Sequence, residues 1–174
     1  MTRVLVTGGA GFVGSNLVHA LLARGDDVVV LDNFATGRRV NLVGAIERIR
    51  LVEGSLSDPT AVDEALDGVD AVLHQGALPS VPKSVELPLL TNQANIVGTL
   101  VLLDACKRFG IQRLVYAASS SAYGDHDASI KDETLPAIPK SPYAVQKYTG
   151  EMYCKVYTEL FDLPTIALRY FNVF

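Results

Sequence analysis

The segment Tyr143-Ala144-Val145-Gln146-Lys147 sets a phenol and an ammonium four residues apart. On a helix, residues at this spacing share one face and lie one turn apart. A free tyrosine titrates near pH ~10, and a nearby positive charge favours its phenolate, which can then accept a proton closer to neutral pH. The same spacing is common in surface helices, so it indicates a proton-transfer pair only together with further partners.

Three consecutive serines, Ser119, Ser120 and Ser121, directly follow an apolar run that predicts a strand over 113–117. A hydroxyl at the end of a strand could share a proton with Tyr143 and with a substrate oxygen. The alternative is that these serines bind their own backbone where the strand turns into a loop. Together with the glycine turn described next, the pattern favours Ser119, Tyr143 and Lys147 as catalytic residues.

A glycine-rich turn lies near the start of the chain, with Gly8, Gly11 and Gly14 placed between a predicted strand at 4–6 and a predicted helix. Glycines at this spacing allow a tight turn, a close approach to a pyrophosphate and tight packing of helix on strand. The free N–H groups at the helix start and the helix dipole then favour the phosphates. Three spaced glycines alone also fit an ordinary turn, but the flanking strand and helix favour a dinucleotide site.

Asp32 ends the second predicted strand, 18 residues after Gly14. A carboxylate at this place can accept hydrogen bonds from the adenosine ribose hydroxyls and repels a 2′-phosphate, so we expect NAD rather than NADP. Arg38 and Arg39 follow in the next loop and could serve a phosphate, although solvated arginines fit the sequence equally well.

Strand-like runs alternate with amphipathic segments along the whole chain. Strands are predicted at 4–6, 27–31, 50–52, 71–74, 113–117 and 165–168, helices at roughly 12–30, 58–66, 85–108 and 142–161, and loops at 33–41 and 124–142. This alternation is typical of α/β proteins with a parallel sheet covered on both faces. We expect one domain over 1–174: a doubly wound, Rossmann-type sheet of six strands in the order 3-2-1-4-5-6, with the ligand at the carboxyl ends of the strands.

Composition excludes several classes of protein. The 174 residues are 49% hydrophobic and 20% charged, with a net charge of −4, so no basic face for nucleic acid or an anionic membrane is expected. We find no export signal and no uninterrupted apolar run long enough to span a bilayer. Cys106 and Cys154 lack other ligands at metal-binding spacing, so we expect them to pack in the core, and we expect no metal site.

These residues, in this order, resemble the extended short-chain dehydrogenase/reductases, and among them the NAD-dependent nucleotide-sugar 4-epimerases. The resemblance covers all 174 residues and includes the glycine turn, Asp32, His74-Gln75-Gly76-Ala77, Asn95, Ser119 to Gly124, Tyr143 with Lys147, and Arg169-Tyr170-Phe171-Asn172. It implies that Tyr143 is the general base, that Lys147 lowers its pKa and holds the nicotinamide ribose, and that Ser119 is the hydroxyl partner. It further implies oxidation at C4 of a UDP-sugar, rotation of the keto sugar and return of the hydride to the other face.

The resemblance also implies contacts for the remaining site residues. Cofactor contacts are expected from Gly8, Gly11, Phe12, Val13, Gly14, Asp32, Asn33, Gly37, Ser55, Leu56, Gln75, Gly76, Ala77, Asn95, Tyr143, Lys147 and Tyr170. Asn95 resembles a residue that braces the central helix. Substrate contacts are expected from Ser80, Val81, Ser84, Ser120, Ser121 and Asn172, because the stretch 77–84 is similar to that of members acting on UDP-N-acetylhexosamines.

Three features depart from the family pattern. Ser55 stands where an aspartate usually holds the adenine amino group, and Gly76 replaces a usual alanine. Family members also continue for more than a hundred residues past the Asn172 region, so we expect the C-terminal substrate domain to be absent from this chain. Two other functions therefore stay open: a compact NAD-dependent oxidoreductase acting on a small alcohol or carbonyl, and a non-catalytic NAD-binding module.

The resemblance implies a partner as well. Segments 91–108 and 142–160 are similar to the helices through which family members pair, so we expect a homodimer. A cytoplasmic location, a UDP-sugar substrate, and neither nucleic acid nor membrane as a partner complete the prediction.

Overall fold

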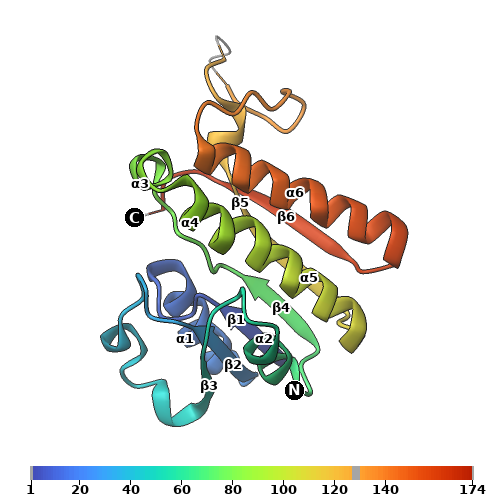
Figure 1. Ribbon diagram of the computed structural model, residues 1–174. Coiled ribbons are helices and arrows are strands. Elements are labelled where there is room, and N and C mark those ends of the chain that lie inside the picture. The colour runs from blue at the N-terminus through green and yellow to red at the C-terminus, as the bar shows by residue number, and fades with distance from the viewer. Residues whose placement is uncertain (1, 127–129, 174) are drawn as a thin grey trace.

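The computed structural model describes residues 2–126 and 130–173, which form one parallel sheet with helices on both faces (Figure 1). The strand order is β3-β2-β1-β4-β5-β6, and every neighbouring pair is parallel. The six-stranded, doubly wound fold expected from the sequence is therefore confirmed. The strands are β1 (Arg3–Thr7), β2 (Asp27–Asp32), β3 (Ile49–Glu53), β4 (Ala71–His74), β5 (Arg113–Ser119) and β6 (Thr165–Tyr170).

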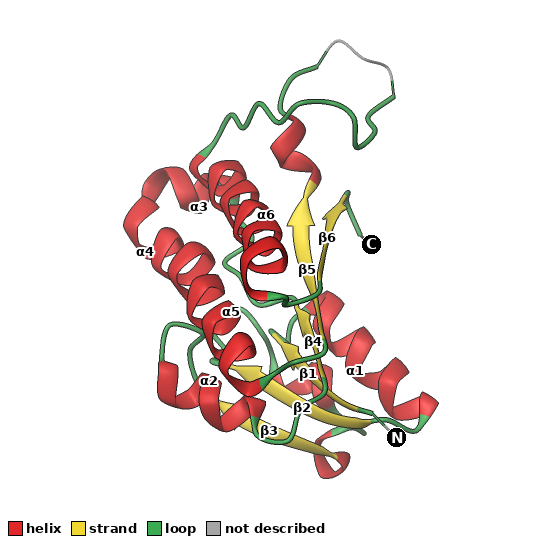
Figure 2. Ribbon diagram, turned by 90° about the vertical axis from the view of Figure 1, so that its right-hand side faces the viewer, coloured by secondary structure: helices red, strands yellow, loops and turns green. Residues whose placement is uncertain are grey.

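The helices are unevenly divided between the two faces of the sheet. Figure 2 shows α2, α5 and α6 on one face and α1 on the other. The bounds are α1 (Phe12–Arg24), α2 (Pro59–Leu66), α3 (Val81–Glu86), α4 (Pro88–Asn92), α5 (Gly98–Phe109) and α6 (Pro142–Phe161). Short 3₁₀ turns lie at Arg39–Leu42, Ile46–Arg48 and Ser120–Tyr123. Of the expected loop 124–142, residues 127–129 lie outside the described part, and α6 already begins at Pro142.

The first helix is shorter than the expected range of 12–30. It ends at Arg24 because Gly25 adopts the left-handed conformation (φ 89°), and the Gly25 N–H bonds back to the carbonyl oxygens of the last turn. Strand β2 then starts at Asp27.

The expected single helix at 85–108 is instead three helices and a π turn. Leu87 leaves the helical conformation (φ −128°, ψ 62°) because the following Pro88 disfavours it, so α3 and α4 are separate. A π turn at Gln93–Val97 then joins α4 to α5. Single π turns inside helices occur frequently at functional sites.

Apolar side chains fill both faces of the sheet. On one face, Leu114 and Tyr116 of β5 are fully buried together with Leu103 of α5. On the other face, Val6 of β1 is fully buried together with Val18 of α1. The expectation for the two cysteines is confirmed, since both are free thiols buried in the larger core. Burial raises the pKa of the Cys106 thiol, and it raises the pKa of Cys154 to about 12.

One helical stretch, Pro88–Phe109, is long and apolar enough by length and composition to cross a membrane. The sequence analysis did not anticipate this, because polar residues interrupt the stretch. In the fold its apolar side chains Leu102, Leu103 and Cys106 are fully buried in the core between the helices and the sheet. The apolar side chains of α5 therefore serve the packing of a covered sheet, whereas Leu89 in α4 is exposed.

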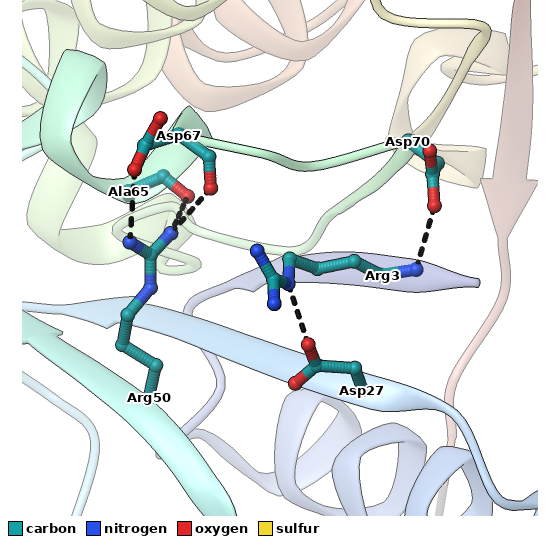
Figure 3. A network of polar contacts seen from close by, with 6 residues as sticks. All are labelled: Arg3, Asp27, Arg50, Ala65, Asp67 and Asp70. Carbon is teal, nitrogen blue, oxygen red and sulfur yellow. Dashed lines mark hydrogen bonds and ion pairs between the residues drawn. The ribbon is translucent and has the colours of Figure 1, made fainter. Parts of the chain in front are cut away.

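Charged side chains join the elements at the amino ends of the strands (Figure 3). In β1, the Arg3 backbone N–H donates to Asp70 Oδ2 (2.8 Å) and the Arg3 Nε donates to Asp27 Oδ2 (2.5 Å). In β3, Arg50 Nη2 donates to the Asp67 carbonyl oxygen (2.9 Å). These contacts lie at the edge of the sheet opposite to the carboxyl ends of the strands, so they leave that end free for a ligand.

Candidate active site

A cavity of about 1130 Å³ lies along the carboxyl ends of the strands. This exceeds the roughly 300–1,000 Å³ of most small-molecule sites, as a site for a dinucleotide and a second ligand requires. The sequence-predicted residues in its wall are Gly8, Gly11, Phe12, Val13, Gly14, Asp32, Asn33, Gly37, Ser55, Leu56, Gln75, Gly76, Ala77, Val81, Ser119, Ser120, Ser121, Tyr143, Lys147, Tyr170 and Asn172.

The glycine turn is tight, and the backbone around Gly8 and Gly14 favours glycine at both positions. Gly8 has a φ of 66°, and its carbonyl oxygen accepts a hydrogen bond from the Gly11 N–H (3.0 Å). A Cβ on Gly14 would lie 2.1 Å from the same oxygen, so only glycine fits there. No side chain caps α1 at Gly11, so the first N–H groups of the helix are available to phosphates.

Asp32 is held in one orientation at the end of β2. Its Oδ2 accepts the Ala10 N–H (2.9 Å) and its Oδ1 accepts the Phe34 N–H (2.8 Å), while the residue is 7% exposed. Each carboxylate oxygen has a further lone pair, which can accept a hydroxyl of a bound ribose.

The three candidate catalytic residues meet in the cavity wall. Ser119 ends β5, while Tyr143 and Lys147 lie in the first turns of α6. The start of α6 is set by Ser141, whose Oγ accepts the Ala144 N–H (3.1 Å). Ser119 Oγ accepts the N–H of Ser121 (3.2 Å) and the Ser121 hydroxyl (2.8 Å), so the expected backbone capping occurs beside the cavity.

Burial controls the ionisation of the tyrosine and the lysine. It raises the pKa of Tyr143 above its ordinary value, and a hydrogen bond with Ser119 acts in the opposite direction. Burial also lowers the pKa of Lys147 to about 8. The Lys147 ammonium donates to the Ala117 carbonyl oxygen (2.8 Å) and lies over the Tyr116 ring. Tyr143 is therefore a neutral phenol near pH 7, whereas the sequence analysis expected Lys147 to lower its pKa.

Two predicted substrate residues lie outside the cavity wall and shape it instead. Ser80 caps α3 by accepting the Lys83 N–H (3.1 Å). The fully buried Ser84 accepts the Tyr143 N–H (3.0 Å) and donates to the Val81 carbonyl oxygen (2.7 Å). Ser84 thereby fixes α3 against the start of α6, beside Tyr143.

Asn95, expected near the cofactor, is buried in the π turn and also lies outside the wall. Its Oδ1 accepts the Leu78 N–H (2.7 Å), and its Nδ2 donates to the Leu78 carbonyl oxygen (3.2 Å) and to Gln146 Oε1 (2.8 Å). Gln146 in turn donates to Thr91 Oγ1 (2.9 Å). Asn95 therefore braces the segment after β4 and the helix that carries Lys147.

A buried histidine extends this brace to the glycine turn. The Thr99 hydroxyl donates its only proton to the Asn95 carbonyl oxygen (2.7 Å), so it must accept its contact with His74 Nε2 (3.0 Å). His74 therefore carries its proton on Nε2, and Nδ1 accepts from the Thr7 hydroxyl (2.7 Å). Burial lowers the pKa of His74 to about 3, which keeps the ring neutral.

Sequence reasoning missed several groups in the cavity wall. Lys83 in α3 and Lys131 in a loop add cations, and Asp125 adds an anion, but such isolated charges carried no motif. Gln75 Nε2 is buried and has no hydrogen-bond acceptor within the described part of the chain. An unpaired donor in the wall, together with the glycine turn, fits a cavity built for a ligand with many acceptor atoms.

Residues 4–174 match the NAD dependent epimerase/dehydratase family. The chain belongs to this family. Among its relatives, the UDP-glucose 4-epimerase of Corynebacterium glutamicum is 38% identical over 173 residues, which are 98% of this chain and 51% of that protein.

Solved structures of epimerases share the fold. The UDP-glucose 4-epimerase of Thermus thermophilus in complex with NAD has a TM-score of 0.91 and 43% identity, over 97% of this chain and 55% of that one. The UDP-N-acetylglucosamine 4-epimerase of Methanobrevibacter ruminantium in complex with UDP-N-acetylmuramic acid has a TM-score of 0.94 and 40% identity, over 99% of this chain and 56% of that one. The chain spans about half the length of these epimerase/dehydratase relatives.

Proposed function

We propose that this chain binds NAD and carries the catalytic residues for C4 epimerisation of a UDP-hexose or UDP-N-acetylhexosamine. The observation that carries the proposal is the meeting of Ser119, Tyr143 and Lys147 in the same cavity wall as the glycine turn and Asp32. Relatives named for this activity, and two of their structures with NAD or a sugar nucleotide, support it.

In this proposal the chain binds the two ligands and moves one proton. The N–H groups of the glycine turn would hold the pyrophosphate, and Asp32 would accept the ribose hydroxyls. Tyr143 Oη would take the proton of the C4 hydroxyl and later return it, and Ser119 would orient that oxygen by a hydrogen bond. When bound, NAD would supply the acceptor for the C4 hydride and a positive charge that favours the Tyr143 phenolate.

Lys147 would hold the nicotinamide ribose in this scheme. Its ammonium already donates to Ala117, so it is fixed next to the place where a nicotinamide ribose would lie. With a pKa of about 8 it is mainly protonated at pH 7 and can donate to a ribose hydroxyl.

Calorimetric titration with NAD, followed by UDP-N-acetylglucosamine added to the complex, tests the proposal. Binding of both ligands, with interconversion of the C4 epimers followed by NMR, is the expected result. Binding of NAD alone would reject the epimerase reaction for this chain, and failure to bind NAD would reject the whole proposal. Net formation of NADH from a simple alcohol would instead identify a small-molecule oxidoreductase.

Tyr143→Phe tests the chemical role within the same experiment. Loss of the general acid–base is expected to lower kcat by about 10²–10⁴-fold with little change in NAD affinity. Tyr153→Phe, on the same helix but outside the cavity wall, is the matched control and should retain activity. Unchanged turnover of Tyr143→Phe would identify another group as the base and would favour a non-catalytic NAD-binding role for this cavity.

We also propose a cytoplasmic homodimer, as the family resemblance implies. Exposed apolar side chains on the outer helices support pairing: Leu89 is 86% exposed in α4, and Leu160 is 70% exposed in α6. Analytical ultracentrifugation measures the assembly, and a monomer at all concentrations would reject the dimer.

A further inference from the structure

Two arginines directly follow Gly37, a residue of the cavity wall beside Asp32, and one of them is already engaged. The Arg39 guanidinium forms an ion pair with Glu53 and lies 4.2 Å from the centroid of the Phe34 ring. Arg38 is exposed and forms no ion pair within the described part of the chain. Arg39 is therefore already paired with a carboxylate, whereas Arg38 is unpaired within the described part of the chain.

The register of the sheet places the Arg39–Glu53 pair beside the proposed ribose site. Glu53 is the direct neighbour of Asp32 across the β2–β3 ladder, and adjacent strands lie about 4.8 Å apart. The Asp32 carboxylate is fixed by two backbone N–H groups, and Phe34 is held at a φ of 55°. The guanidinium of Arg39 is therefore anchored next to Asp32, but on the carboxylate of Glu53.

The loop between these residues is itself firmly placed. The Arg38 N–H donates to the Ala10 carbonyl oxygen (2.9 Å), and a Cβ on Gly37 would lie 2.9 Å from Asp32 Oδ2. Because this backbone packs against the end of β2, the loop brings Arg39 to the proposed ribose end of the cavity, where its side chain is 62% exposed and could change partner if Glu53 were removed.

We propose that Glu53 is a cofactor-specificity residue, which holds the Arg39 guanidinium and so withholds it from the 2′-phosphate that distinguishes NADP from NAD. This inference rests on the proposed binding of NAD. A guanidinium binds a carboxylate and a phosphate through the same planar fork, so the two anions compete for Arg39. Asp32 then acts by repulsion, and Glu53 acts by occupying the Arg39 guanidinium.

Glu53→Gln releases Arg39 and tests the inference by binding alone. The pair is exposed, at 62% and 58% of the two side chains, so about 1 kcal/mol bounds its strength. This corresponds to a decrease of about five-fold in the Kd for NADP. The Kd for NAD should stay within about two-fold of its original value.

Two further variants separate the mechanism from a general charge effect. Glu47→Gln removes the same charge from an exposed residue that has no ion pair within the described part of the chain, and it should leave both affinities unchanged. Arg39→Met in the Glu53→Gln background should abolish the gain in NADP affinity. Persistence of the gain without Arg39 would overturn the inference, because Glu53 would then act by repulsion alone.

The failure of this inference is distinguishable from failure of the proposed function. An unchanged Kd for NADP in Glu53→Gln, with normal NAD binding, would overturn the role of Glu53 and leave the proposed function intact. Failure of the unsubstituted protein to bind NAD would overturn both.

Discussion

The buried His74 predicts that the fold loses stability in mild acid. Its pKa is about 3 in the folded protein and 6.5 when exposed, so between these values the unfolded chain binds a proton that the folded chain does not. The free energy of unfolding should therefore fall with decreasing pH, by about 1.4 kcal/mol per unit below pH 6. Between pH 7.5 and pH 5 this single residue accounts for about 2 kcal/mol.

Urea denaturation at pH 7.5 and 5, followed by circular dichroism, measures this contribution. His74→Gln lacks the titrating group, so its loss between the two pH values should be smaller by about 2 kcal/mol. Lys147, with a pKa of about 8 in the fold and 10.5 when exposed, stays mainly protonated in both states over this range, and it is present in both proteins, so its small contribution cancels in the comparison. An equal pH dependence in both proteins would refute the reasoning.

The ring itself can be observed if the variant does not fold. ¹⁵N-resolved NMR of the unsubstituted protein should show a proton on Nε2 and a neutral imidazole down to pH 5. A midpoint above pH 5 would contradict the lowered pKa of His74, and a proton on Nδ1 would contradict the hydrogen-bond directions assigned through Thr7 and Thr99.

The remaining predictions concern the glycine turn and the attachment of β6. Gly14→Ala must open the turn by about 1 Å to relieve its 2.1 Å contact, which should break a hydrogen bond to the charged pyrophosphate and lower NAD affinity by about 10- to 100-fold in calorimetry; Gly44→Ala, with open space around its Cβ, should cost stability of about 1 kcal/mol and leave that affinity unchanged. Glu151→Gln keeps one acceptor oxygen but replaces the other by an NH2 group, so it breaks one of the two hydrogen bonds from the nearly buried Arg169 (2.9 and 2.7 Å) and removes the ion pair; it should cost about 2–3 kcal/mol in urea denaturation. Glu159→Gln, in an exposed pair, should cost less than about 0.5 kcal/mol, and equal effects of the two substitutions would contradict this account.

The sheet and the glycine turn were predictable because their sequence signals are local. Alternating strands and helices with right-handed crossovers leave few strand orders, and the observed order is the expected one. Gly8 and Gly14 were predictable for the same reason, since the turn depends on residues close in the sequence.

The apolar pattern alone predicted neither the breaks within 81–109 nor the partners in the buried brace, although the family resemblance implied a bracing role for Asn95. The apolar pattern continues through Leu87 and the π turn, so periodicity alone shows one helix. The contacts of His74 with Thr7 and of Asn95 with Gln146 join residues 67 and 51 positions apart, and each residue alone has no motif. Only the three-dimensional fold brings these polar groups together.

The two buried thiols can report how often the helices that cover one face of the sheet move away from it. Cys106 lies in α5 and Cys154 in α6, at 0% and 1% exposure, and burial suppresses their ionisation. An alkylating reagent attacks the thiolate, so labelling requires that the helix swing away from the sheet. In the native protein, the labelling rate of each cysteine therefore measures how often its helix opens. These are the helices that carry part of the brace and Lys147.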